Sequence, residues 1–143
     1  MTAPAPESAV EALQGAIIDL LRTAPALAEL TAGRVYDEAP GDQDRPDPPY
    51  AYVAAVNKTR HELGCGAGWN VRMRFYVIGT DFGRVKLWKI IEIMTRLLDE
   101  FEPILDGPFR THDRITVSQS GDVIEPTNPK SAFIDLVTIV GDA

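Results

Sequence analysis

Apolar residues near the start of the chain recur with the spacing of a helix. From Ser8 to Thr23 they fall at offsets of three, four and seven positions, which places them on one helical face. These residues are Val10, Leu13, Ile17, Leu20 and Leu21. Ser8 and Glu11 have the spacing of a capping box, and Pro25 makes continuation past Thr23 costly. The pattern predicts an amphipathic helix that packs one face against a core.

A second period, of two residues, predicts a strand at Trp69–Ile78. Apolar residues alternate there with other residues, so one face would be buried and the other solvated. The apolar set is Val71, Met73, Phe75 and Val77, and the other set is Asn70, Arg72, Arg74 and Tyr76. The composition of Tyr50–Lys58 is also typical of a strand, and the glycine-rich residues 63–68 would join the two strands in a hairpin.

The rest of the chain predicts one more long helix and several strands. Asp81 can cap that helix and Pro103 can end it, and its apolar stripe is expected to pack on the apolar strand face. The stripe is Leu87, Ile91, Met94, Leu98 and Phe101. Strands are predicted at Val35–Tyr36, at about Ile115–Ser118 and at Ala132–Val140. The expected fold is α+β, in the order α-β-β-β-α-β-β, with an antiparallel-rich sheet and two helices on one face.

Length and composition indicate a single globular domain. The 143 residues are 45% hydrophobic and 24% charged, close to the globular average. We expect residues 1–7 to be a flexible leader and residues 8–143 to form the domain. The lone Cys65 can form no internal disulfide, and no Cys/His cluster has zinc-site spacing. A soluble, unexported protein is expected, because no apolar stretch approaches the roughly 20 residues of a membrane span and no export signal is recognisable.

The charge of the chain bears on its partners. The net charge of -7 and the sequence pI of about 4.7 argue against tight nonspecific binding to nucleic acid, which depends on basic patches. The charge is unevenly distributed, however, because residues 58–96 carry eight basic and three acidic side chains. Such a split is typical either of a mixed solvated surface or of a docking surface, and both interpretations stay open.

No combination of residues predicts catalysis or cofactor binding. His61 and His112 have no carboxylate or serine at a diagnostic spacing and are interpreted as surface histidines. The glycine-rich run at 64–68 precedes a strand rather than a helix, so it is interpreted as a hairpin tip, with Cys65 as an exposed structural thiol. One cluster of carboxylates, interpreted as solvated rather than as an acid/base or calcium site, consists of Asp99, Glu100, Glu102 and Asp106. We therefore expect no enzyme and no metal or cofactor site.

The charges of the second long helix run against its dipole. Basic residues lie at its start and acidic residues at its end, although the dipole favours the opposite order by about 0.3–1 kcal/mol per charge. The basic set is Arg84, Lys86 and Lys89, and the acidic set is Asp99, Glu100 and Glu102. If identical subunits meet head to tail in a ring, the basic end of one helix can face the acidic end of its neighbour. The alternative is that packing alone stabilises the helix, because dipole effects are small and screened.

The segment Asp37–Pro49 can only be a loop, because it combines four prolines with five acids. The acids are Asp37, Glu38, Asp42, Asp44 and Asp47. The loop is longer than a routine connection of about 4–6 residues. We expect it to be mobile in the free protein and ordered by a docking partner. The alternative is a loop that is merely tolerated, because insertions in surface loops cost little.

Several short motifs together resemble a known family. Leu20-Leu21, then Leu27 and Leu30, are followed by Gly33-Arg34-Val35-Tyr36, by the acidic loop, and by Pro49-Tyr50-x-Tyr52-Val53. This order resembles the tail-completion or tail-terminator proteins of long-tailed bacteriophages, prophages and gene transfer agents, and the resemblance extends from about Ser8 onward. The chain departs from the family pattern in its unusually acidic residues 39–49 and in residues 57–62.

The resemblance implies a structural virion protein rather than an enzyme. Such a protein forms a sixfold ring on the head-proximal end of the tail tube, stops tube polymerisation and joins the tail to the head connector. Its implied partners are its own copies, the tail tube protein, a connector or stopper protein, and DNA that passes through the ring without specific binding. No membrane and no cofactor is implied, and synthesis would take place in the bacterial cytoplasm. Arg72 and Arg74 would line the lumen or an interface. Another ring-forming neck protein, or a small-molecule-binding α+β domain, is the alternative.

Overall fold

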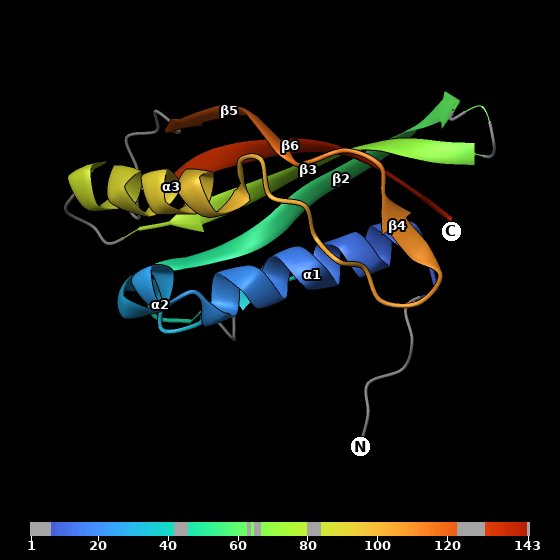
Figure 1. Ribbon diagram of the computed structural model, residues 1–143. Coiled ribbons are helices and arrows are strands. Elements are labelled where there is room, and N and C mark those ends of the chain that lie inside the picture. The colour runs from blue at the N-terminus through green and yellow to red at the C-terminus, as the bar shows by residue number, and fades with distance from the viewer. Residues whose placement is uncertain are drawn as a thin grey trace, which may run out of the picture.

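The computed structural model describes residues 7–41, 46–62, 64, 67–79, 84–122 and 131–142. In this part of the chain one curled sheet carries its helices on a single face (Figure 1). The helices are α1 (Ala9–Thr23), α2 (Pro25–Thr31) and α3 (Arg84–Leu98), and the strands are β1 (Val35–Tyr36), β2 (Tyr50–Glu62), β3 (Ala67–Ile78), β4 (Phe109–Thr111), β5 (Thr116–Asp122) and β6 (Ser131–Asp142). The predicted α+β class is confirmed.

α1 begins and ends where the sequence predicts. Ser8 Oγ accepts a hydrogen bond from the Glu11 backbone N–H at 3.1 Å, and Glu11 Oε2 accepts one from the Glu7 N–H at 3.0 Å. The first bond satisfies a backbone donor that a helix start otherwise leaves free, and the second holds the residue before the Ser8 cap. Leu13, Ile17 and Leu21 are buried, which confirms that the apolar face meets the core.

α2 was not predicted, and it corrects the expectation of two helices. Ala24 is extended, with φ −65° and ψ 120°, and Pro25 then occupies the start of a new helix. Proline is favoured there because its fixed φ suits a helix and its missing N–H needs no partner. The helix ends at Thr31, and the two residues that follow, Ala32 and Gly33, have left-handed φ angles of 52° and 74°. The same proline that ends α1 therefore begins α2.

The sheet is antiparallel apart from one short pair. Its order is β1-β2-β3-β6-β4, and β5 also pairs with β6. β1 runs parallel to the start of β2, with Val35 opposite Ala51 and Tyr36 opposite Tyr52. The three-residue β4 was not predicted, and it pairs with the end of β6. β6 thus has three strand neighbours and lies inside the sheet.

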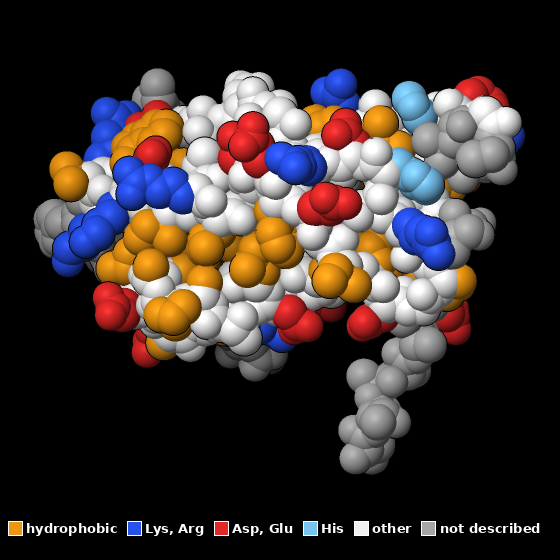
Figure 2. Space-filling view, viewed as in Figure 1, with side chains coloured by type: hydrophobic (Ala, Val, Ile, Leu, Met, Phe, Trp, Pro, Cys, Tyr) orange, Lys and Arg blue, Asp and Glu red, His pale blue; other side chains and the backbone are white. Residues whose placement is uncertain are grey.

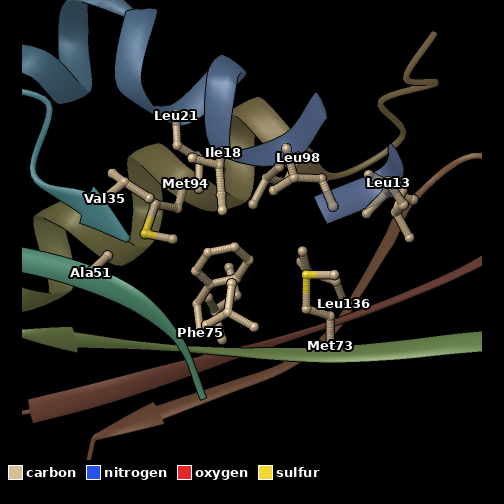
Figure 3. Close-up of a cluster of buried hydrophobic side chains, with 14 of the residues drawn as sticks. Leu13, Ile18, Leu21, Val35, Ala51, Met73, Phe75, Met94, Leu98 and Leu136 are labelled. Carbon is tan, nitrogen blue, oxygen red and sulfur yellow. The ribbon is translucent and has the colours of Figure 1, made fainter. Parts of the chain in front are cut away.

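The core lies between α1, α3 and the sheet, as the apolar stripe predicts (Figure 3). Leu87, Ile91, Met94 and Leu98 of α3 are each at most 1% exposed. The strand residues that they cover are Val71, Met73, Phe75 and Val77, which are also buried. None of the helices in the described residues is long and apolar enough to span a membrane.

α3 ends at Leu98, earlier than the predicted end at Pro103. Glu100 adopts a left-handed φ of 63°, which terminates the helix. Its N–H donates to Ile115 O at 2.7 Å, and Ile115 N–H donates to Phe101 O at 2.8 Å. These bonds tie the chain to the residue before β5, so Phe101 lies outside the helix and is only half-buried. A contact distant in sequence, rather than the proline, sets the end of α3.

Candidate subunit interface

The face of the sheet opposite the helices carries the two arginines expected on the wet side of β3. No helix covers this face in the described part of the chain (Figure 1). A shallow hollow of about 300 Å³ lies on it. Its lining includes Asn57, Arg72, Arg74, Gln119, Asp135 and Val137. The structure therefore brings Arg72 and Arg74 together on one open surface.

Arg74 is already paired within the chain. Its Nε and Nη2 donate to the two carboxylate oxygens of Asp135 at 2.7 and 2.9 Å, because β3 and β6 place the two residues opposite each other. Its guanidinium also lies 4.3 Å from the centre of the Phe133 ring. The hydrogen bond to Asp135 holds the pKa of Arg74 above its ordinary value. Arg72, by contrast, is exposed, so the face presents one neutralised and one solvated cation.

Four tyrosines continue this open region toward β1. The ring centres of Tyr36 and Tyr50 are 6.3 Å apart, those of Tyr50 and Tyr52 are 6.3 Å apart, and those of Tyr52 and Tyr76 are 5.9 Å apart. Burial, followed by the neighbouring Tyr50 and Tyr76, raises the pKa of the Tyr52 hydroxyl. The cluster extends from Tyr36 and Tyr50, which flank the acidic loop, to Tyr76 in β3.

Within the described residues, the sheet has an unpaired edge on each side. β2 pairs with β1 only at Ala51 and Tyr52, and no described strand pairs with the outer edge of residues 53–62. On the other side, β5 pairs with β6 and with no other described strand. The far half of the β2–β3 hairpin projects beyond the helices (Figure 1), and β2 is exposed from Ala54 to Arg60. Free strand edges of this kind are ready to pair with another chain.

The charges at the two ends of α3 stay apart within the chain, and two of them have internal partners. Arg84 pairs with Asp122 of β5. Asp99 Oδ1 accepts a hydrogen bond from the Val117 N–H at 3.0 Å, which gives the carboxylate a role at a helix end where the dipole disfavours it. The remaining predicted charges, Lys86, Lys89, Glu100 and Glu102, are exposed. The structure thus leaves two lysines at one end of α3 and two glutamates beyond the other for external contacts.

The acidic loop is held at both of its ends. Arg34 Nε donates to Pro49 O at 3.3 Å, and Arg22 Nε donates to Val35 O at 2.8 Å. Three of the predicted acids, Asp37, Glu38 and Asp47, are exposed. Asp42 and Asp44 lie outside the described residues, and so does the central part of the segment for which mobility is expected.

Two features of the helical side were missed in the sequence. Ile104 follows α3 and is 93% exposed. A cavity of about 220 Å³ lies between α2 and the start of α3, with Leu30, Leu87 and Ile90 among its walls. Figure 2 shows the apolar band that runs between α3 and the two N-terminal helices. Inward and outward residues alternate in this segment, with Phe101, Pro103 and Leu105 inward. This alternation was the signal in the sequence that could have predicted an outward-facing Ile104.

The histidines and carboxylates that could take part in catalysis are not brought together into a reactive centre in the described part of the chain. His112 is exposed and His61 is half-buried in β2, while Cys65 lies outside the described residues. The four carboxylates near the end of α3 are all exposed, in line with the solvated interpretation. No group of three or more His, Cys, Asp or Glu among the described residues is arranged to hold a metal ion.

Comparisons with protein families and with solved structures each found a match. A solved chain titled "Virion of native gene transfer agent (GTA) particle" shares the fold, with a TM-score of 0.74, 21% sequence identity, and coverage of 94% of this chain and 97% of that chain. No curated protein matches. The family described as "Tail completion protein gp17" matches residues 15–141, which confirms the resemblance seen in the sequence. The chain therefore belongs to the tail completion protein gp17 family and is a structural, non-enzymatic part of a virion tail.

Proposed function

We propose that this protein forms a sixfold ring on the head-proximal end of the tail tube, ends tube polymerisation and joins the tail to the head connector. The observation that carries the proposal is the pair of free edges on one sheet, at β2 and at β5. Family membership supplies the setting, a virion tail. The sixfold number comes from the family resemblance of the sequence.

The two free edges run in opposite directions. β2, β3, β6 and β5 alternate in direction across the sheet because each pair is antiparallel. The β2 edge and the β5 edge are therefore two different surfaces of the same sheet, and a contact between the β5 edge of one copy and the β2 edge of the next is head to tail. Such a contact uses two different surfaces of each copy, and it generates a ring when the rotation closes.

The open sheet face suits a channel through which DNA passes without sticking. The pair formed by Arg74 and Asp135 removes one of the two cations that the sequence assigns to this face. Nonspecific DNA binding grows with the number of phosphates that free basic residues neutralise. A lumen that exposes Arg72 as its solvated cation, in a chain of net charge -7, would therefore bind DNA only weakly.

The rims of the ring would meet different proteins. The acidic loop between β1 and β2 is the docking element on this proposal, because Asp37, Glu38 and Asp47 are exposed while its ends are held by the fold. The partners at the two rims are the tail tube protein and a connector or stopper protein. Assembly would follow synthesis in the bacterial cytoplasm.

Deletion of the gene in the element that encodes the protein tests the terminator role. We expect tails of uncontrolled length and heads without tails in electron micrographs, because nothing would stop tube growth or join the two parts. Expression from a plasmid should restore tails of normal length. Tails of normal length without the protein would overturn the proposal.

A second experiment separates a terminator from another neck ring. In a host blocked in head assembly, antibody labelling should find the protein on the ends of free tails. In a host blocked in tail assembly, it should be missing from heads. The reverse pattern would assign the protein to the head connector. The mass of the purified protein in solution, together with negative-stain imaging, tests a different alternative. A monomer with a bound metabolite would favour a small-molecule-binding domain over a ring.

A further inference from the structure

Ile104 is an apolar side chain presented to solvent on a fixed segment. It is 93% exposed, whereas its neighbours Pro103 and Leu105 are buried. Thr111 Oγ1 donates to Pro103 O at 2.9 Å, and Ile115 N–H donates to Phe101 O at 2.8 Å. These bonds hold the segment in place without any contact from Ile104 itself. Its exposure is therefore built into the backbone rather than the result of a loose loop.

Two acidic side chains lie on the same segment as this apolar residue, and Arg110 lines the same hollow as Ile104. The segment alternates, so Glu102 and Asp106 lie on the same outward side as Ile104 and are exposed. Exposed isoleucines are common singly and need no explanation on their own. An isoleucine between two outward carboxylates, on a segment with a fixed backbone, has the form of an apolar contact residue with a charged rim.

The cavity at the other end of α3 has the complementary form. Its volume is about 220 Å³, enough for a branched aliphatic side chain. The apolar walls come from Leu30 of α2, from Leu87 and Ile90 of α3, and from Pro49. The polar rim consists of Lys86, Lys89 and Glu29, so basic groups outnumber the acid. Among the described residues, neither lysine has a carboxylate within 4.0 Å.

The two features cannot meet within one copy. They lie at opposite ends of α3, whose 15 residues span about 22 Å at 1.5 Å per residue. Ile104 and the cavity are thus two different surfaces of one chain, one apolar with acidic neighbours and the other apolar with two lysines at its rim. A contact between two different surfaces of identical copies is head to tail.

We infer that Ile104 of one copy inserts into the cavity between α2 and α3 of the next copy, with Glu102 and Asp106 beside Lys86 and Lys89. The occupant is a second copy of this chain. The inference rests on the proposed ring and names a contact within it. It also gives a reason for the reversed charge order of α3, because the basic start of one helix receives the acidic segment that follows the other.

Cross-linking in assembled particles tests the contact. The lone cysteine is first removed by Cys65→Ser, and the chain then receives Ile104→Cys and Glu29→Cys, both at exposed positions. A short thiol-reactive cross-linker should join copies into a ladder on a denaturing gel, with one band at the size of the closed ring. Each single cysteine variant should give dimers at most.

The matched control replaces Ile104→Cys by Arg96→Cys, at an exposed position on α3 that lines neither the cavity nor a free strand edge. If the test pair gives no more cross-linking than this control while a ring is still seen at the tail end, the contact is wrong and the proposed function stands. If no ring is present at the tail ends of unmodified particles, the proposed function fails as well.

A second measurement isolates the apolar part of the contact. Ile104→Ser should weaken self-association of the chain by at least about tenfold, because burial of this side chain is lost. Arg96→Ser is the control and should change it much less, because this exposed residue lines neither the cavity nor a free strand edge. Circular dichroism should show both variants folded, since Ile104 makes no core contact. Equal self-association of the two variants would overturn the inference.

Discussion

Arg34 and Pro49, 15 residues apart, close the acidic loop. Arg34 Nε donates to the Pro49 carbonyl at 3.3 Å, and Arg34 O accepts from the Ala51 N–H at 3.0 Å. The two halves of the motif that marks the family, residues 33–36 and 49–53, are therefore direct neighbours. Val35 lies opposite Ala51 and Tyr36 lies opposite Tyr52 in the parallel pair. The motif therefore holds the base of the loop.

Removal of the Arg34 side chain should loosen this closure. We expect Arg34→Met to lower the free energy of unfolding by about 1–2 kcal/mol, because the partly buried Pro49 carbonyl loses a charged donor. Urea unfolding measures the change. The control is Arg72→Met on the exposed face, which should change stability by less than about 0.5 kcal/mol. Equal effects of the two substitutions would contradict the role of Arg34.

The centre of the core should be sensitive to truncation at Leu98. This residue is 0% exposed and packs between α1 and the sheet (Figure 3). Leu98→Ala is expected to lower the free energy of unfolding by about 2–5 kcal/mol, since it removes buried methyl groups and leaves a cavity. Ile104→Ala, at an exposed position nearby in sequence, should cost less than about 0.5 kcal/mol in the monomer.

The tyrosine cluster should make stability depend on alkaline pH. The unfolded chain ionises Tyr52 at its ordinary pKa of 10.0, whereas the folded chain has a higher pKa. Above about pH 10 the unfolded state therefore loses this proton first, and the free energy of unfolding falls as the pH rises. Tyr52→Phe should reduce the fall measured by urea unfolding at pH 9 and pH 11. If the free energy of unfolding falls equally in the variant and in the wild type, Tyr52 is not the source of the fall.

The basic end of α3 should control assembly rather than folding. We expect Lys86→Glu with Lys89→Glu to weaken the ring and leave the monomer folded, because both side chains are exposed and lie on the rim of the α2–α3 cavity. Arg84 is kept, since it pairs with Asp122. The matched control, Arg96→Glu with Arg114→Glu, makes the same change in charge at other exposed sites. Sedimentation velocity and far-UV circular dichroism supply the measurements, and an unchanged oligomer would argue against the interface.

The acidic loop can be shortened without disturbing its base. Replacement of residues 41–47 by a Gly-Ser link keeps Arg34, Pro49 and β1 in place. We expect the variant to fold and to form rings, with fewer tails joined to heads in electron micrographs. Normal joining would leave the loop without a docking role.

The long elements of the fold were predictable because their periodicity is strong. α1, β3 and α3 each show one clear apolar face in the sequence, and that face is buried in the structure. α2 was missed because Pro25 is both a barrier to α1 and a favoured first residue of a new helix. β4 is too short to show a period, and only its pairing with β6 makes it a strand.

The interface was predictable in its charges and not in its pairings. The acids and bases at the ends of α3 are visible in the sequence, but the partner of Arg74 lies 61 residues away. The cavity beside Lys86 and Lys89 combines residues from four separate segments. Such contacts follow from the register of the strands and from the angle between helices, which local patterns do not encode.

β6 follows β3, β4 and β5 in the chain although all three pair with it. A ribosome that adds about 5–20 residues per second therefore delivers three strands before their shared neighbour emerges. During that interval β3 has an unpaired edge, and the apolar faces of α1 and α3 have only part of the surface that they will cover. Completion of the sheet and of the core therefore waits for the translation of β6.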